Sequence, residues 1–237
     1  MFASVLTSVG ASMLAVCGGV AWLSPALSLQ AVGLMDCKDK SALVNVRAMG
    51  CWQLCASTVL IAGLNGCDFA AGVGLVAAAV ASLMVVVPWE ALGRPVGPQV
   101  PGILIFTTLG VLTLTSAISP WVAAVIYLLL GCLIYVSPVE TAKLYMLTEP
   151  MSNLAYSILS VAGGHIAMTG IYLAALAGSM SQPVCFAVTF GVNAGIVLKW
   201  ALLDASAFDA RSFRPLVWVA ISALLAGGSL QLEQRAS

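Results

Sequence analysis

The chain has 237 residues, of which 61% are hydrophobic and 8% are charged. Soluble globular proteins are about 45–50% apolar and about 25% charged, so this composition excludes that class and indicates a lipid bilayer as the solvent. Nine Lys and Arg residues balance nine Asp and Glu residues. A net charge of zero without a basic tract argues against nucleic-acid binding.

Apolar runs divide the chain into segments long enough to cross a membrane, which takes about 20 mostly apolar residues in a helix. Prolines lie at or near the ends of most runs, where a missing N–H does least harm. We therefore predict an all-α polytopic membrane protein with about eight transmembrane helices and no sizeable soluble domain. The predicted spans are residues 2–24, 43–64, 69–91, 101–118, 120–138, 152–177, 183–203 and 214–232.

The basic residues test this count independently, because short loops rich in Lys and Arg stay on the cytoplasmic side of a membrane. They concentrate in the connections after the first, third, fifth and seventh spans, whereas the opposite side has only Arg235. We therefore expect both termini on the exoplasmic or lumenal side. The basic residues of those four connections are Lys38, Lys40, Arg94, Lys143, Arg211 and Arg214.

The two halves of the chain follow a common order with an offset of 113 residues. Leu23-Ser24-Pro25 corresponds to Val136-Ser137-Pro138, and Gly50 corresponds to Gly163. Each half consists of an apolar run, a Ser-Pro break, a short interfacial stretch and a span centred on glycine. This order predicts a duplicated four-helix unit. The predicted repeats are residues 1–118 and 119–237.

An even number of spans in each unit means that both units insert with the same polarity. We therefore predict a parallel repeat, related by an axis along the membrane normal, and not an inverted one. The stretches 26–34 and 139–147 are too short to span and are expected to lie along the interface. An aromatic belt is expected from the tryptophans near the span ends, which are Trp89, Trp121, Trp200 and Trp218.

Small residues dominate several predicted helix faces. In the seventh span, Gly191 and Gly195 lie four residues apart. Small side chains let backbones approach closely in lipid, where packing drives helix association. Tight packing within the bundle is one interpretation of such a face, and a partner helix docked on it is the other.

A short motif carries a family resemblance. Span two contains Arg47-Ala48-Met49-Gly50-Cys51-Trp52, and span three ends in Pro88-Trp89-Glu90. Over residues 23–117, this arrangement resembles the small four-helix scaffold protein of ergosterol biosynthesis. The second half departs from it, with Ser160 and His165 in place of Arg47 and Trp52. That family tethers membrane enzymes without catalysis, so the resemblance implies a helical scaffold and carries over no sterol partner.

His165 is the single histidine and falls near the middle of the sixth span, after two glycines. An ionisable residue at membrane depth is a functional hypothesis by default. A neutral imidazole can ligate the magnesium of chlorophyll or a haem iron, and the glycines would leave room for a flat macrocycle. It can equally bond to a neighbouring helix or relay protons. Chlorophyll or carotenoid is the cofactor class that these alternatives suggest.

Asn193 and Gln53 are the other polar candidates for cofactor binding within spans. Each can ligate a pigment or form a bond between helices, which contributes about 0.6–2 kcal/mol. Arg47 lies about one turn into the second span and can reach the interface, toward a lipid phosphate or Glu90. Charged residues at span ends, such as Lys199, are expected to be solvated.

Motifs of soluble enzymes are missing. There is no Gly-x-Ser-x-Gly element, P-loop or dinucleotide-binding fingerprint, and one His cannot build a two-His metal site. The seven cysteines form no CxxC motif, and their odd number argues against a disulfide framework. We therefore expect no catalytic residues, no metal site and no enzyme activity.

These observations favour a non-catalytic integral membrane subunit or scaffold of a larger membrane complex. Its expected partners are membrane lipids and other integral membrane proteins. A photosynthetic supercomplex in a thylakoid is one setting, since His165 and Asn193 would hold pigments there. A respiratory or biosynthetic complex fits equally well. The alternative is a transporter or channel for a small uncharged or lipidic solute, with a polar cavity on the axis between the repeats.

Overall fold

The computed structural model describes residues 2–91, 97, 100–144, 151–204 and 214–236. These residues form helices and short connections without any strand, which confirms an all-α polytopic membrane protein. The elements are α1 (Phe2–Leu23), α2 (Pro25–Ala31), α3 (Lys40–Asn65), α4 (Cys67–Ala91), α5 (Val100–Leu114), α6 (Pro120–Val136), α7 (Pro138–Leu144), α8 (Asn153–Ala177), α9 (Gln182–Lys199), the π-helical turn η2 (Trp200–Asp204) and α10 (Arg214–Ala236).

Helices occupy all eight ranges predicted as spans, but they differ in length. Six of the described helices are long and apolar enough to cross a membrane, namely α1, α3, α4, α8, α9 with η2, and α10. Helix α5 has only 15 residues. Helix α6 reaches sufficient length only together with α7, which bends away from it by 112°. The described part of the chain therefore holds six to seven spans by length and composition.

Short polar side chains and prolines begin several of these helices. Asp39 caps α3 by accepting a hydrogen bond from the amide of Ala42, and Ser152 caps α8 by accepting one from Ala155. Helix α6 begins with Pro120 after the cap Ser119, where the missing N–H of proline costs nothing. The helix starts are thus encoded locally.

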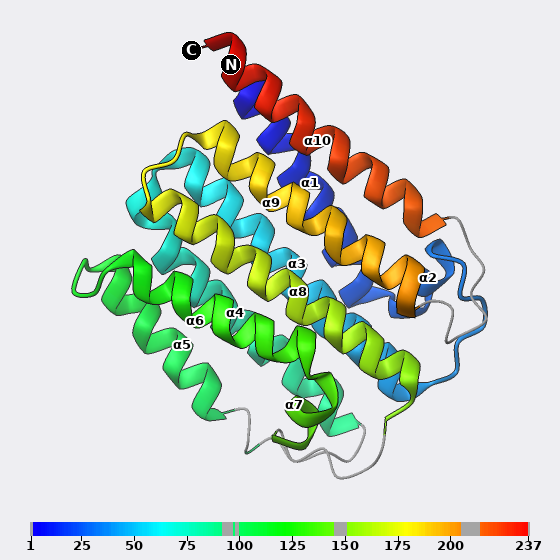
Figure 1. Cartoon of the computed structure of the whole chain (residues 1–237). Coiled ribbons are helices and arrows are strands. Elements are labelled where there is room, and N and C mark those ends of the chain that lie inside the picture. The colour runs from blue at the N-terminus through cyan, green and yellow to red at the C-terminus, as the bar shows by residue number, and fades with distance from the viewer. Residues whose placement is uncertain (1, 92–96, 98–99, 145–150, 205–213, 237) are drawn as a thin grey trace.

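Helices α3 and α8 lie side by side in the middle of the bundle and run in the same direction (Figure 1). At their N-termini, the hydroxyl of Ser152 donates to the carboxylate of Asp39. Near their midpoints, Gln53 contacts His165. Helix α1 packs on α3, and α6 packs on α8, so these four helices form the centre of the fold.

Some element bounds recur with an offset of 113 residues. Helix α2 (25–31) and helix α7 (138–144) are shifted by 113 residues, as are the starts of α3 and α8. The two short helices cover residues 26–31 and 139–144 of the stretches expected at the interface, and residues 145–147 lie outside the described residues. Glycines make the equivalent crossings close: a Cβ at Gly50 would lie 2.8 Å from the Trp22 nitrogen, and one at Gly163 would lie 2.6 Å from the Tyr135 nitrogen.

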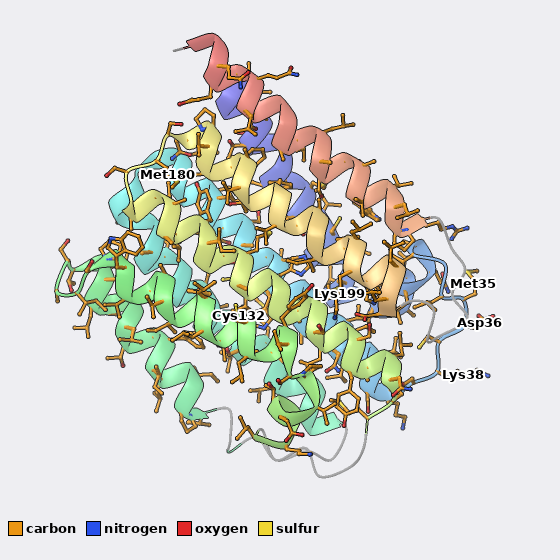
Figure 2. The ribbon with its side chains drawn as sticks, viewed as in Figure 1. Met35, Asp36, Lys38, Cys132, Met180 and Lys199 are labelled. Atoms are coloured by element: carbon orange, nitrogen blue, oxygen red, sulfur yellow. The ribbon has the colours of Figure 1, made fainter. Side chains whose placement is uncertain are left out.

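The ends of the bundle differ in charge. The two termini lie together at one end (Figure 1). Met35, Asp36 and Lys38 lie at the opposite end from Met180, which belongs to the turn between α8 and α9 (Figure 2). Arg94 and Arg211 lie outside the described residues. The described basic residues of the predicted cytoplasmic connections lie at the α2 end, and these are Lys38, Lys40, Lys143 and Arg214.

Cysteine labelling tests this arrangement. A membrane-impermeant maleimide should label Cys37 from the side opposite the termini, because it lies in the connection between α2 and α3. In a Cys37→Ser background, Ser181→Cys should be labelled from the side of the termini, because Ser181 is exposed before α9. Labelling of both positions from one side would contradict the topology.

Substituting glycines tests the helix crossings. Gly50→Ala should lower the stability in detergent by about 1–3 kcal/mol, because overpacking a close contact costs that much. Gly191→Ala is the matched control, since nothing lies within 4 Å of a Cβ at this position. The measurement is thermal unfolding of both variants, and equal melting temperatures would argue against the α1–α3 crossing.

Candidate functional site

The three polar residues predicted to bind a cofactor lie at the same depth of the bundle. His165 is the central residue of α8, Gln53 lies at the middle of α3, and Asn193 lies at the middle of the continuous helix formed by α9 and η2. All three line one cavity with a volume of about 320 Å³. The structure therefore brings together residues that are 112 positions apart in the sequence, as Gln53 and His165 are.

His165 holds a defined place in a hydrogen-bond chain. Its Nδ1 atom lies 2.9 Å from the carbonyl oxygen of Val161, which can only accept, so Nδ1 carries the proton. Its Nε2 atom is then the acceptor for the Gln53 amide nitrogen, 3.2 Å away. This arrangement turns the Gln53 oxygen away from His165. That oxygen is buried and has no hydrogen-bond partner among the described residues.

Asn193 and Trp200 show the same incomplete bonding. The Asn193 amide donates to the hydroxyl of Ser222 on α10 over 2.9 Å, while its oxygen has no partner among the described residues. The indole N–H of Trp200 is also buried without a described partner. Both side chains line the cavity with Gln53. Two acceptors and one donor are therefore left at one cavity.

The walls of this cavity are otherwise apolar and uncharged. They come from α1, α2, α3, α8, α9, η2 and α10, and among the lining residues that the structure describes none is Asp, Glu, Lys or Arg. Arg214 donates to the carbonyl oxygen of Gln30 over 2.9 Å, which ties the start of α10 to α2 beside the cavity. Val16 on α1 and Ala31 on α2 are exposed lining residues, so the cavity is open beside these helices.

A magnesium-bearing macrocycle does not fit this arrangement of side chains. Ligation would need the Nε2 atom of His165, which already accepts a hydrogen bond from Gln53. The glycines expected to leave room are closely covered: a Cβ at Gly163 would lie 2.6 Å from the Tyr135 nitrogen, and one at Gly164 would lie 2.9 Å from Ile196. These glycines serve helix packing.

The interface pair predicted on the cytoplasmic side is described only in part. Arg47 is half-buried on α3, and its Nε atom has no hydrogen-bond partner among the described residues. Glu90 belongs to α4, but its side chain lies outside the described residues. A lipid phosphate as the partner of Arg47 stays a prediction.

The sequence did not predict the polar cluster at the end of α9. Lys199 was expected to be solvated, but its Nζ atom lies 3.1 Å from the Asp204 carboxylate and 3.1 Å from the Ser160 hydroxyl. It also lies 4.8 Å from the centre of the Tyr135 ring. The spacing of Lys199 and Asp204, which the π-helical turn brings together, is the signal that could have revealed the ion pair.

Trp200 was expected in an aromatic belt at the membrane surface. Instead, its side chain is 7% exposed and contributes to the core. The reason is its position at the start of η2, where α9 continues across the cavity.

Comparisons with protein-family models, with curated proteins and with solved structures give no match. The described residues hold no group of three or more His, Cys, Asp or Glu side chains able to bind a metal ion. The function of the site is therefore inferred from its geometry alone.

A double-mutant cycle tests the contact between α3 and α8. Gln53→Leu should destabilise the protein because it leaves the Nε2 atom of His165 buried without a donor. Gln53→Leu combined with His165→Leu should cost less than the sum of the single changes, with a coupling of about 0.6–1.7 kcal/mol. The measurement is reversible unfolding in detergent, and additive costs would show that the two side chains do not interact.

Proposed function

We propose that the protein is a non-catalytic membrane subunit or scaffold that docks a transmembrane helix of another integral membrane protein on α9. The observation that carries this proposal is an exposed stripe along α9. Its members recur every three or four residues and so share one face. They are Val188, Gly191, Gly195, Leu198 and Leu202, all exposed.

The glycines of this stripe differ from those inside the bundle. Gly50 and Gly163 are covered by neighbouring backbones, whereas nothing lies within 4 Å of a Cβ at Gly191 or Gly195. Two glycines four residues apart on an apolar helix form a face that lets a second backbone approach closely. Since no described helix of this chain fills that face, another chain is the occupant that the face fits.

The proposal includes eight spans arranged as two parallel four-helix repeats, with both termini on the exoplasmic or lumenal side. The offset shared by α2 with α7 and by the starts of α3 and α8, together with the parallel direction of α3 and α8, supports the repeat. The basic residues at the α2 end support the orientation. Helices α5 and α6 are short for spans, and their pairing with the longer helices of the bundle supports their placement in the membrane.

Transport of a small uncharged or lipidic solute is the competing function. It calls for a polar path on the axis between the repeats. Helices α3 and α8 pack against each other, and the described residues that line the cavity come from both predicted repeats and are mostly apolar. This arrangement favours a scaffold. A photosynthetic setting would require a pigment that does not use the Nε2 atom of His165.

Bulky substitution of the stripe tests the docking. Gly195→Leu should leave folding unchanged but reduce the amount of partner that copurifies from native membranes by at least about tenfold, because a leucine there blocks close approach of a second backbone. Gly227→Leu is the matched control, since Gly227 is exposed on α10 and a Cβ there also meets nothing within 4 Å.

The measurement is quantitative mass spectrometry of affinity-purified variants extracted in mild detergent. Unchanged recovery of all partners with Gly195→Leu would overturn the proposed docking on α9. If the isolated wild-type protein moved a solute into liposomes and copurified with no partner, transport would replace the scaffold.

A further inference from the structure

The cavity at mid-depth is lined by residues other than those of the stripe on α9. Three of its lining residues each have a buried polar atom without a described partner: the oxygens of Gln53 and Asn193 and the indole N–H of Trp200. Asn193 is 5% exposed and Trp200 is 7% exposed. A buried polar group left unpaired costs about 1–3 kcal/mol, so a molecule that pairs with these atoms gains that amount on binding.

The chemistry of the walls restricts the occupant. The described residues that line the cavity include no Asp, Glu, Lys or Arg, so a phosphate or carboxylate among them would be desolvated without a countercharge. Apolar walls with a few polar groups are typical of pockets for small lipophilic molecules, which have volumes of about 300–1,000 Å³. The volume of about 320 Å³ lies within this range. The occupant is therefore neutral and mostly apolar.

The polar atoms also lie at two depths. Asn193 and Trp200 are seven residues apart on one continuous helix, which corresponds to about 10 Å along its axis. The acceptor oxygens of Gln53 and Asn193 lie at the deep level and require a donor. The Trp200 donor lies nearer the α2 end and requires an acceptor.

We propose that this cavity binds a neutral lipid whose hydroxyl group donates to Gln53 or Asn193 at the middle of the membrane. The Trp200 N–H serves a second oxygen of the same molecule, nearer the surface. The exposed lining residues Val16 and Ala31 place the opening beside α1, a helix with membrane-spanning composition. The lipid therefore enters sideways from the membrane.

Quenching of tryptophan fluorescence tests this proposal directly, because Trp200 and Trp218 line the cavity. The purified full chain in detergent is titrated with three probes that share one dibrominated long chain. The alcohol should quench saturably. The methyl ether, which cannot donate, and the ionised carboxylate, which carries a charge, should each bind at least about tenfold more weakly.

Two variants locate the binding. Val197→Phe fills the cavity between Asn193 and Trp200 and should abolish saturable quenching by the alcohol while the protein remains monodisperse and helical. Gln231→Leu removes a polar side chain from the exposed face of α10 and should bind the alcohol as the wild type does.

Equal affinity of the alcohol and the methyl ether for the wild-type protein would overturn the proposal, because the polar atoms would then not be recognised. Wild-type affinity in folded Val197→Phe would also overturn it. The comparison of probes uses the wild-type protein, so it tests recognition of the hydroxyl group even if Val197→Phe does not fold. Binding of the alcohol does not depend on the partner on α9. The quenching experiment can therefore contradict the lipid site without contradicting the proposed scaffold, and the copurification experiment can do the reverse.

Discussion

Contacts between the parallel helices α3 and α8 fix the positions of the other central helices. Inside a membrane, polar groups have no water to bond with, so they must find partners within the protein. This pair forms such bonds at three levels: Asp39 with Ser152, the Asn45 amide with the Ala155 carbonyl over 2.7 Å, and Gln53 with His165, while the oxygens of Asn45 and Gln53 keep no described partner. Once these two helices are held in register, α1 and α6 pack on their outer sides in equivalent ways.

Some glycines and polar side chains of this bundle are covered or bonded by neighbouring helices, whereas others are not. Gly50 and Gly163 lie at close helix crossings, whereas Gly191 and Gly195 lie open on α9. Likewise, His165 is bonded on both ring nitrogens, whereas the buried oxygen of Asn193 has no described partner. We assign contacts with other molecules to the uncovered glycines on α9 and to the unpaired oxygen of Asn193.

Hydropathy was sufficient to locate the long helices, because spans must be apolar and long. The Ser-Pro breaks marked the short interfacial stretches in which α2 and α7 lie. Hydropathy also singled out Gln53, His165 and Asn193 as polar residues at depth. It could not show that they line one cavity, since lipid-facing and buried faces are both apolar and the sequence does not reveal which way a side chain points. For the same reason Trp200 was placed at the surface, and the shortness of α5 was not foreseen.

The proposed function makes this chain one component of a larger membrane assembly. Native mass spectrometry can show this, with the protein extracted from its own membrane in mild detergent. We expect particles that contain other integral membrane proteins in fixed ratio to the 24.3 kDa chain. Particles that consist of this chain alone, or of whole-number multiples of it with nothing but lipid, would exclude the proposed function.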